Sequence, residues 1–404
     1  MKKLVQINSF DSGSTGNIAK QINKTAEEHG FKTFFLFGRY WKNKNKIEGT
    51  KIGIQFDCFV HLLFSRCFDT MGLLSHLTTY KLIKNLKQIK PDIVHIHNIH
   101  GYYLNYPMFF KYLRKSKIKV VWTLHDCWSF TGHCSHFDLI KCERWKTGCY
   151  SCPLKKEYPK SILFDNSKRN YELKKERFTS IKETLTLVPV SHWLENIVEQ
   201  SFLRNMNIKV IHNGIDLNVF KPYDDNDVLI KYGIPEKKIL LGVASPWSER
   251  KGLYDFMKLS KYLSSDYVIV LVGLTVDQIK SLPSNIFGFE RTQNAQDLAK
   301  LYSSADVFLN LTYEDNYPTV NLESIASGTP VITYKTGGSP ESVTNKIGRI
   351  VEQGNFEELI EAIYSLDKCD KEELKKQCRK YAEDNFDKNV CFSQYIDLYN
   401  NIIK

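Results

Sequence analysis

Three acidic side chains, Glu314, Asp315 and Glu323, stand in the stretch LTYEDNYPTVNLESIASGTPVITYKTGG, among residues typical of a core. Pro318 suits the start of a helix, because its missing N–H would be unpaired there anyway, and Gly328 suits the position just past the end. Glu323 is therefore predicted on a short helix, and the other two acids on the loop before it. A carboxylate beside an apolar helix face needs hydrogen-bond donors to offset its desolvation. The two vicinal hydroxyls of a ribose would satisfy Glu323, and Asp315 could accept from a sugar hydroxyl.

A pair of cations, Arg250 and Lys251, follows a strand-like run and precedes Gly252 and a predicted helix. Positive charges are unfavourable at the start of a helix, because the peptide dipoles place partial positive charge there. An anionic ligand between the two side chains, most simply a diphosphate, would remove the conflict. A solvated basic turn is the alternative interpretation.

A glycine-containing loop follows the first strand-like run, in the segment NSFDSGSTGNIAKQI. Gly13 and Gly16 would let backbone N–H groups approach an anion at the start of the next helix. The segment is not a P-loop, since no Gly-Lys-Ser/Thr follows. It predicts either a loop that faces a phosphate or a plain tight turn.

Histidines gather where two strand-like runs end. DIVHIHNIHGYY holds His95, His97 and His100, and VVWTLHDCW holds His125 followed by Asp126. The carboxyl ends of parallel strands are where α/β proteins bind ligands. We expect His125 to orient or deprotonate a substrate hydroxyl. The first three could bind a metal ion, or they could be buried, hydrogen-bonded histidines.

Four cysteines in the string CSHFDLIKCERWKTGCYSC have the spacing C-x7-C-x6-C-x2-C. They are Cys134, Cys142, Cys149 and Cys152. Disulfides are disfavoured in a reducing cytosol, so the group predicts a structural zinc ion held by four thiolates, with no open position. His133 or His136 could replace one thiolate. Reduced core or loop cysteines are the alternative, since a zinc ribbon has two CxxC pairs and this string has one.

These side chains need a scaffold of alternating strands and helices. Helical patterns are expected at 16–29, 252–264 and 294–304, and two helices with a break at 383–387 end the chain. Nearly continuous apolar runs, as in strands covered on both faces, lie at 4–10, 33–37, 92–97, 119–124, 186–190, 209–212, 238–244, 267–273, 306–310, 330–334 and 348–351. Such alternation predicts an α/β fold with two doubly wound domains facing a cleft. The turn-rich segment HNGIDLNVFKP divides them into residues 1–215 and 216–385.

Composition and charge narrow the class of protein. The 404 residues contain no run of 18 or more apolar residues, and MKKLVQINSF turns polar too early for a signal peptide, so a cytoplasmic protein is expected. The net charge of +11 is uneven, with nine Lys or Arg and one acid in residues 81–120. This excess suggests an anionic partner: phosphate, a membrane surface or nucleic acid. The apolar stretch 56–77 could lie in a membrane interface, or it could form a pair of core helices.

Taken together, EDNYPTVNLESIASGTPVI, HNGIDLNVFKP and the KG after a strand resemble the retaining GT-B glycosyltransferases of family 4. The strings GSTGNIA, HIHNIHGYYLN and WTLHDCWSFTGHC, with the cysteine string, resemble a narrower branch, the colanic-acid-type transferases of polysaccharide assembly. The resemblance covers nearly the whole chain. It implies two Rossmann-like domains: an N-terminal acceptor-side domain, to which the helix at 386–404 returns, and a C-terminal nucleotide-sugar-binding domain.

The resemblance also implies roles for individual residues. Glu323 would contact the donor ribose. Asp315 takes the place of the first acid of the family's E-x7-E motif, with a shorter side chain. Lys251 would bind the diphosphate, and the family's arginine falls on Ser245, so Arg250 is expected to supply that charge. The other implied contacts are Gly13, Gly16 and Asn316 to the donor, His125 at the sugar–acceptor junction, and His97 and His100 on the acceptor side.

The activity implied is hexosyl transfer with retention and without a catalytic metal ion, from a UDP- or GDP-type sugar to a glycan or polyprenyl-diphosphate-linked acceptor. Such a reaction would serve capsule, exopolysaccharide or O-antigen synthesis, in the cytoplasm or peripherally on the inner face of the membrane. A sugar phosphorylase or a nucleotide-sugar epimerase of similar architecture would need no such acceptor. A nucleic-acid-binding protein is the remote alternative, since no recognised nucleic-acid module is present.

Overall fold

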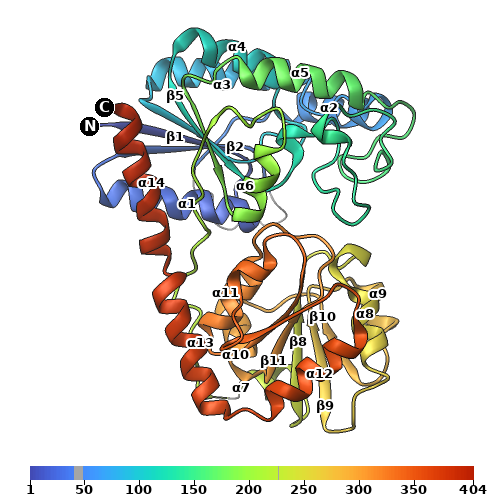
Figure 1. The fold of residues 1–404 in the computed structure, drawn as a ribbon. Coiled ribbons are helices and arrows are strands. Elements are labelled where there is room, and N and C mark those ends of the chain that lie inside the picture. The colour runs from blue at the N-terminus through green and yellow to red at the C-terminus, as the bar shows by residue number, and fades with distance from the viewer. Residues whose placement is uncertain (41–48, 226) are drawn as a thin grey trace. The chain divides into compact units, whose positions relative to one another are not determined.

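The computed structural model describes residues 1–40, 49–225 and 227–404. The described residues form two compact units. Unit 1 comprises residues 1–212 and 392–404, and unit 2 comprises residues 213–391. Each unit has a parallel sheet of its own with helices on both faces (Figure 1).

Unit 1 is built on a seven-stranded sheet with the order β3-β2-β1-β4-β5-β6-β7, and all neighbouring strands are parallel. Its strands are β1 (Lys3–Phe10), β2 (Lys32–Arg39), β3 (Thr50–Lys51), β4 (Ile93–Ile96), β5 (Lys119–Leu124), β6 (Leu185–Pro189) and β7 (Asn207–Ile208). The central strands are almost wholly buried, as their continuous apolar sequences predict. The chain order reverses between β1 and β4, so the loops after these two strands flank the point where α/β sheets bind ligands.

Helices α3, α4 and α5 cover one face of this sheet, and α1 and α14 cover the other (Figure 1). The helices of unit 1 are α1 (Gly13–Glu28), α2 (Gln55–Phe68), α3 (His76–Ile89), α4 (Tyr106–Ser116), α5 (Ser167–Thr179), α6 (His192–Glu199) and most of α14 (Lys388–Ile403). Two buried tyrosines fix α14 to the sheet: Tyr395 Oη lies 3.0 Å from Thr123 Oγ1, and Tyr399 Oη lies 2.6 Å from His95 Nδ1.

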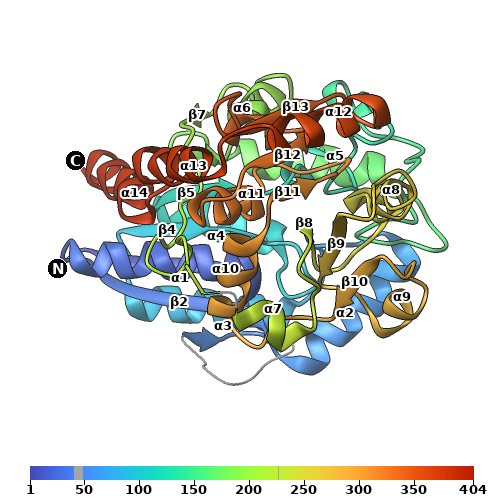
Figure 2. The same cartoon turned by 90° about the horizontal axis from the view of Figure 1, so that it is seen from below.

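Unit 2 has a six-stranded parallel sheet with the order β10-β9-β8-β11-β12-β13, which is a doubly wound arrangement with its reversal between β8 and β11. Its strands are β8 (Lys238–Val243), β9 (Tyr267–Val272), β10 (Ile286–Phe289), β11 (Val307–Asn310), β12 (Val331–Tyr334) and β13 (Gly348–Val351). Its helices are α7 (Asp227–Tyr232), α8 (Leu253–Leu259), α9 (Val276–Lys280), α10 (Ala295–Ser304), α11 (Thr319–Ala326), α12 (Phe356–Asp367) and α13 (Lys371–Asn385). Helices α8, α9 and α12 lie on one face of the sheet, and α10 and α11 on the other (Figure 2).

The parallel α/β prediction is confirmed, but some predicted elements were wrong in detail. In place of the strand predicted at 209–212, the structure has the short strand β7 at Asn207–Ile208. The N–H groups of Lys209 and Ile211 still donate to β6, but Pro189 at the end of β6 has no N–H to return a bond, so the regular pairing stops. The edge strand β10 was missed, because Gly288 interrupts its short apolar run. The helix predicted over 252–264 ends at Leu259. None of the helices in the described parts of the chain combines the length and apolar character needed to cross a membrane.

Candidate functional site

Four predicted residues of unit 2 lie on neighbouring segments at the carboxyl ends of adjacent strands. Arg250 and Lys251 form part of a 3-10 turn (Glu249–Lys251) after β8. Asp315 lies on the loop after β11, and Glu323 lies on α11, which follows that loop. We call Arg250, Lys251, Asp315 and Glu323 the unit 2 site. Because β8 and β11 flank the reversal of strand order, this is where a doubly wound sheet places a ligand.

Direct bonds join the two loops of the unit 2 site. Lys251 Nζ lies 2.5 Å from Asp315 Oδ2, and each side chain is only about one-fifth exposed. Arg250 Nη1 donates to the carbonyl of Glu314 at 2.7 Å, and the N–H of Tyr313 donates back to the carbonyl of Arg250 at 2.8 Å. The predicted cation and acid are therefore paired with each other, which offsets part of the desolvation of both charges.

Two glycines allow these loops to come close. Gly337, on the loop after β12, has φ +52°, and a Cβ there would fall 1.7 Å from the carbonyl oxygen of Asp315. Gly252 has φ +75°, and a Cβ there would fall 2.0 Å from the carbonyl oxygen of Leu311. Only glycine fits both the left-handed backbone and the close approach. Gly337 therefore helps to set the position of Asp315.

Glu323 is partly buried in unit 2, where two neighbouring hydroxyls hold its carboxyl group. Its Oε2 accepts from Tyr302 Oη at 3.1 Å, and the Thr319 side chain is a second donor. Burial raises the pKa of the Glu323 carboxyl to about 7, although both hydrogen bonds act in the opposite direction. Leu322 and Ile325 on the same helix are fully buried, so the helix has the apolar face predicted beside Glu323. Tyr302, which lies on α10, was not identified from the sequence, because nothing in the sequence pattern links it to Glu323.

In unit 1, Gly13 and Gly16 lie in the first turns of α1, after β1. Gly13 has φ +77°. A Cβ on Gly16 would lie 3.0–3.1 Å from the backbone of Phe10 and Asp11, so this glycine lets α1 start close to the end of the strand. Ser12 at the N-cap makes no side-chain bond to the first turn. Backbone N–H groups of this turn lie at the strand-order reversal of unit 1, where an anion would be expected.

His97 and His125 form a buried chain with Gln6, which sequence reasoning missed although a glutamine within an apolar strand was a usable signal. Gln6 Nε2 donates to Asn23 Oδ1 at 2.9 Å, so Gln6 Oε1 accepts from His97 Nε2 at 2.6 Å. Burial holds the pKa of His97 well below its ordinary value, so the ring is neutral and its Nδ1 accepts from His125 Nε2 at 3.0 Å. Burial also lowers the pKa of His125 to about 4. His125 is thus neutral, with the lone pair on Nδ1.

His100 belongs to a second group. Its Nε2 lies 2.8 Å from Asp126 Oδ2, and its Nδ1 lies 2.9 Å from Tyr158 Oη. Burial raises the pKa of Asp126, but the His100 ring and the N–H of Trp128 outweigh this and bring it to about 2. The structure therefore separates the predicted histidines into two groups: His97 with His125, and His100 with Asp126. The alternative of buried, hydrogen-bonded rings fits His95 and His97, both wholly buried.

The four cysteines of the predicted zinc site line one small cavity in unit 1. Cys134 and Cys152 share a hydrogen bond, and Cys149 Sγ accepts from the N–H of Gly132 at 3.1 Å. Nevertheless, within residues 1–40, 49–225 and 227–404, no three His, Cys, Asp or Glu side chains are arranged as the ligands of a metal ion. His133 lines the same cavity: its Nδ1 is bonded to Asp69 at 2.6 Å, and its buried Nε2 has no hydrogen-bond partner among the described residues, so this nitrogen is the one that could replace a thiolate. The thiols gather as predicted, but not in a ligating arrangement.

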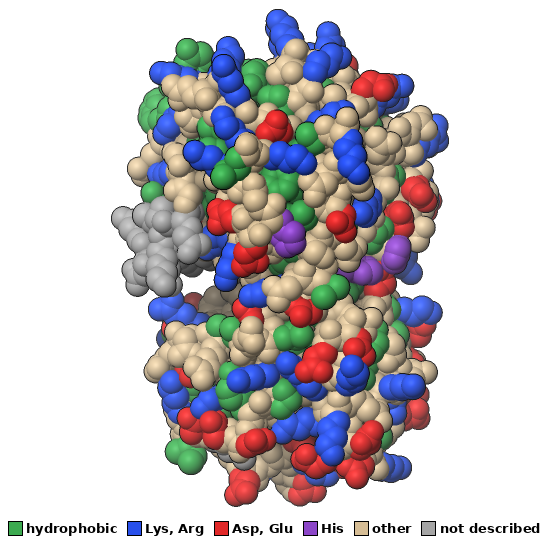
Figure 3. Space-filling view, turned by 90° about the vertical axis from the view of Figure 1, so that its left-hand side faces the viewer, with side chains coloured by type: hydrophobic (Ala, Val, Ile, Leu, Met, Phe, Trp, Pro, Cys, Tyr) green, Lys and Arg blue, Asp and Glu red, His purple; other side chains and the backbone are tan. Residues whose placement is uncertain are grey.

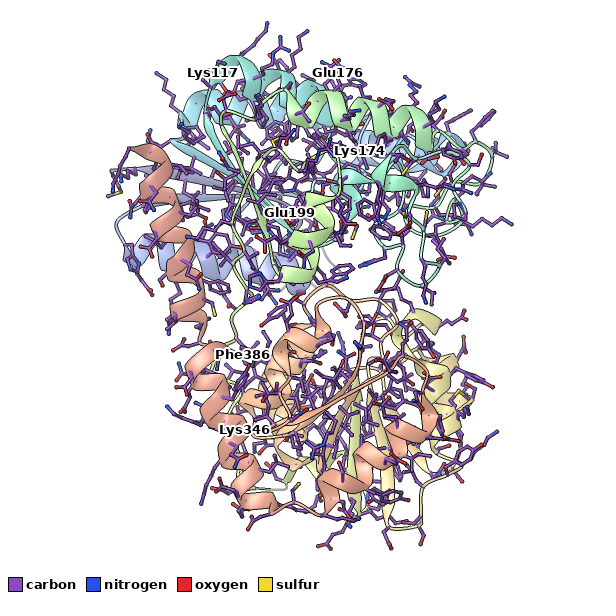
Figure 4. All side chains as sticks on the ribbon, in the orientation of Figure 1. Lys117, Lys174, Glu176, Glu199, Lys346 and Phe386 are labelled. Carbon is purple, nitrogen blue, oxygen red and sulfur yellow. The ribbon has the colours of Figure 1, made fainter. Side chains whose placement is uncertain are left out.

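A buried lysine beside this cavity was also missed. Lys174 on α5 lies among the side chains of unit 1, whereas Glu176 on the same helix points outward (Figure 4). Its Nζ donates to the carbonyls of Trp128 at 2.6 Å and Thr131 at 3.0 Å, and lies 3.5 Å from the centre of the Trp128 ring. Burial lowers the pKa of Lys174 to about 7. A lysine in a helical pattern usually lies on the solvent-exposed side of the helix, so this buried contact was not predicted.

Acidic and basic side chains are interspersed on the face of the molecule drawn in Figure 3, in each unit. In unit 2, many of the lysines have an acidic partner, such as Lys335 with Glu352 at 2.8 Å and Lys238 with Asp367 at 2.5 Å. Although the net charge is +11, the Lys and Arg side chains do not form one continuous stripe on this face.

Both units match models of known protein families. Residues 53–219 match the family model described as Glycosyltransferase Family 4, and residues 224–385 match the model described as glycosyl transferases group 1. The putative colanic acid biosynthesis glycosyl transferase WcaC of Escherichia coli K12 is 23% identical over 383 residues, which cover 86% of this chain and 87% of WcaC.

Two solved structures are similar over almost their whole length. Anabaena Alr3699/HepE in complex with UDP-glucose has a TM-score of 0.69 at 15% identity, with coverage of 99% of this chain and 100% of that one. Sucrose-phosphate synthase from Thermosynechococcus elongatus has a TM-score of 0.70 at 15% identity, with coverage of 100% and 99%. At such low identities these similarities concern the fold.

Proposed function

The chain belongs to the glycosyltransferases with a family 4 domain and a group 1 domain in the GT-B fold, and on this premise we propose that it transfers a sugar from a nucleoside-diphosphate donor in surface-polysaccharide synthesis. The acceptor proposed is a glycan or a polyprenyl-diphosphate-linked sugar. WcaC, the relative named for colanic acid biosynthesis, supports the polysaccharide setting, and the UDP-glucose bound to HepE supports the donor class.

One observation carries the proposal: two loops at the strand-order reversal of unit 2 bring Lys251 to Asp315 and Arg250 to the Glu314 carbonyl. We propose that the donor diphosphate replaces Asp315 as the partner of Lys251 and that Arg250 also binds the diphosphate. Asp315 is then released to accept from a hydroxyl of the donor sugar. Asn316, whose N–H bonds to Asp315 Oδ1 at 2.9 Å, helps to hold that carboxylate in place. The pair with Lys251 keeps both charges in position before the donor arrives.

The proposed reaction breaks the bond between the anomeric carbon and the β-phosphate oxygen, and forms a bond from that carbon to the acceptor oxygen on the same face. The acceptor proton passes to the departing phosphate oxygen. Arg250 and Lys251 stabilise the negative charge that grows on the diphosphate, in the role that a divalent metal ion has in other transferases. We propose that His125 orients a sugar hydroxyl through the lone pair on Nδ1, with His97 fixing its tautomer.

Donor binding tests the proposal. UDP-glucose, GDP-mannose and ADP-glucose are titrated into the full chain by calorimetry, with thermal shift as a screen. We expect one base to bind with a dissociation constant of millimolar or tighter, and Lys251→Ala to weaken that binding at least tenfold. Lys335→Ala is the matched control, because Lys335 is exposed and pairs with Glu352 at the surface. If no nucleotide sugar binds, the proposal fails.

Two finer points have separate readouts. Retention predicts that NMR of the product shows the same anomeric configuration as the donor. Metal independence predicts that transfer continues in EDTA, since cationic side chains take up the leaving-group charge. Inversion, or activity abolished by EDTA and restored by Mg²⁺ or Mn²⁺, would correct the corresponding point.

The structural zinc site stays a proposal. Its support is that Cys134, Cys142, Cys149 and Cys152 all line one cavity, and that the Gly132 N–H already donates to one of the four sulfurs. Zinc would have to draw the sulfurs together to about 2.3 Å from the ion. It would brace the loop that follows β5 and take no part in sugar transfer.

A further inference from the structure

Helix α2 in unit 1 has its polar side inward and its apolar side outward. His61 on α2 is fully buried, its Nδ1 lies 2.8 Å from Ser75 Oγ, and its Nε2 accepts from the N–H of Gly72 at 3.0 Å. Cys58 and Ser65 are buried on the same side. The exposed apolar side chains, between 40% and 73% accessible, are Phe56, Phe59, Leu63, Phe64 and Phe68. A surface helix normally has the opposite arrangement.

A second segment extends this apolar face. The N–H of Ile162 donates to the Arg66 carbonyl at 2.6 Å, and that of Phe164 donates to the Cys67 carbonyl at 3.0 Å, so residues 162–164 run beside the end of α2. The Phe164 ring stacks on Phe68 at 5.3 Å. Ile162, Leu163 and Phe164 are all more than half exposed. We call the five α2 side chains and these three the α2 ridge.

Helix α2 lies at the periphery of unit 1 in both ribbon views (Figures 1 and 2). Eight large apolar side chains open to water in one place are more than scattered surface residues, and a contiguous exposed apolar patch marks an interaction surface. The polar contacts of His61 prevent α2 from simply rotating inward, because they would be lost. The ridge is therefore built to face outward.

The charges beside the ridge favour one kind of occupant. The segment that carries residues 162–164 is basic, with Lys155, Lys156, Lys160, Lys168 and Arg169 against Glu157 and Asp165 between positions 155 and 169. Asp165 is engaged internally, since it accepts from the N–H groups of Cys152 and Ser167. Arg66 adds an exposed cation on α2 itself. A second copy paired through the ridge would bring two basic borders together, whereas anionic lipid headgroups would attract them.

We propose that the α2 ridge inserts into the interfacial layer of a membrane that contains anionic lipids, with its basic border on the headgroups. Interfacial anchors are helices that lie flat on a membrane and insert their apolar, often aromatic, face between the lipids. The exposed phenylalanines of α2 would form such a face. Residues 162–164 add three apolar side chains at one end of that helix. This inference rests on the proposed function for its purpose, because a polyprenyl-linked acceptor is confined to the membrane.

Vesicle co-sedimentation of the full chain tests the inference, with phosphatidylcholine vesicles compared with vesicles that also contain phosphatidylglycerol. We expect binding to the anionic vesicles that weakens when salt is raised, since headgroup attraction is screened. Phe56→Ser/Phe59→Ser should lower the partition coefficient at least tenfold. The matched control is Ile230→Ser/Val276→Ser, which removes two exposed apolar side chains from unit 2 and should bind like the wild type.

Several results of these measurements would overturn the inference. The inference is overturned if the wild type binds neither vesicle, or if Phe56→Ser/Phe59→Ser binds as well as the wild type. It is also overturned if light scattering shows a dimer that this variant dissociates while vesicle binding is absent, because a second copy would then be the occupant. UDP-glucose binding, measured on the same variants, should be unchanged. Loss of donor binding in all proteins with vesicle binding intact would reject the proposed function and keep the anchor.

Discussion

Replacing Glu323 with glutamine is expected to remove most of the pH dependence of donor binding. Oε2 of Glu323 accepts from Tyr302 Oη at 3.1 Å, and Thr319 donates to the same carboxyl group. These bonds do not fully offset desolvation, so burial raises the pKa to about 7. Half of the molecules without donor therefore carry a neutral Glu323 near pH 7. A ribose diol donates two hydrogen bonds and prefers the ionised form, which accepts at both oxygens.

The magnitude follows from the ionised fraction. If only the carboxylate binds the ribose well, the apparent dissociation constant is multiplied by 1 + 10^(pKa − pH). With a pKa of about 7, this factor is about 2 at pH 7 and about 11 at pH 6, relative to alkaline pH. A nucleotide sugar is a diphosphate diester without a proton that titrates in this range. Any pH dependence of donor binding would therefore arise from a group on the protein and not from the donor.

Calorimetric titration of UDP-glucose at pH 6, 7 and 8.5 measures the effect. The wild type should bind about tenfold more weakly at pH 6 than at pH 8.5. Glu323→Gln should bind with one unchanged affinity at all three pH values, weaker than that of the wild type at pH 6, because the amide resembles the neutral acid and no ionised fraction remains. Glu352→Gln is the control, since Glu352 is an exposed partner of Lys335. A wild-type affinity that does not change with pH, or a Glu323→Gln variant with the wild-type slope, would refute this reasoning.

Three further predictions concern stability and metal content. Gly337→Ala should lower the free energy of unfolding in urea by more than the ~1–2 kcal/mol of left-handed strain, because the added Cβ would meet the Asp315 carbonyl. Gly233→Ala is the control: Gly233 has φ +65° and open space around it, so this variant should show the cost of the strain alone. Equal losses of stability in the two variants would contradict the prediction. The pKa of Lys174 falls from 10.5 to about 7 on folding, so the unfolded chain binds more protons between these values. The stability of the wild type relative to Lys174→Met should thus rise with pH over that window, by up to about 1.4 kcal/mol per unit, and a flat difference would contradict it. Elemental analysis after expression with zinc should give about one zinc per chain, lost in Cys149→Ser/Cys152→Ser, whereas absence of zinc from the wild type would reject the site.

Local sequence was enough for most of the scaffold, because the strands are short, apolar and buried on both faces. Strands β5 (Lys119–Leu124) and β13 (Gly348–Val351) have the predicted bounds. The apolar pattern was not enough to predict a strand where a single residue determines the pairing. Pro189 lacks the N–H that pairing with β7 would need, and Gly288 interrupts the apolar run of an edge strand. Helix α11 was found from Pro318 and Gly328, since proline is favoured where a helix begins and glycine just past its end, where Gly328 has φ +86°.

The candidate site was predicted as a set of residue types, but not as a set of contacts. Lys251 and Asp315 are 64 positions apart, and only the order of β8 and β11 in the sheet brings them within 2.5 Å. The Gln6–His97–His125 chain depends in the same way on β1, β4 and β5 being neighbours. Such pairs become visible only when the sheet order is known, because each loop alone is also compatible with a solvated turn.

Helix α2 shows the same limit for surfaces. The sequence of residues 56–77 indicates an apolar helix face, and it leaves open whether that face points toward the core or toward a membrane. The direction is set by polar contacts with other segments: His61 with Ser75, and Asp57 Oδ2 with the N–H of Thr78 at 2.7 Å. These contacts turn the phenylalanines outward, because a buried histidine ring without partners would be more unfavourable than exposed aromatic surface. If His61→Leu gave a stable protein that no longer bound anionic vesicles, the polar contacts, and not the apolar side chains alone, would be what orients the ridge.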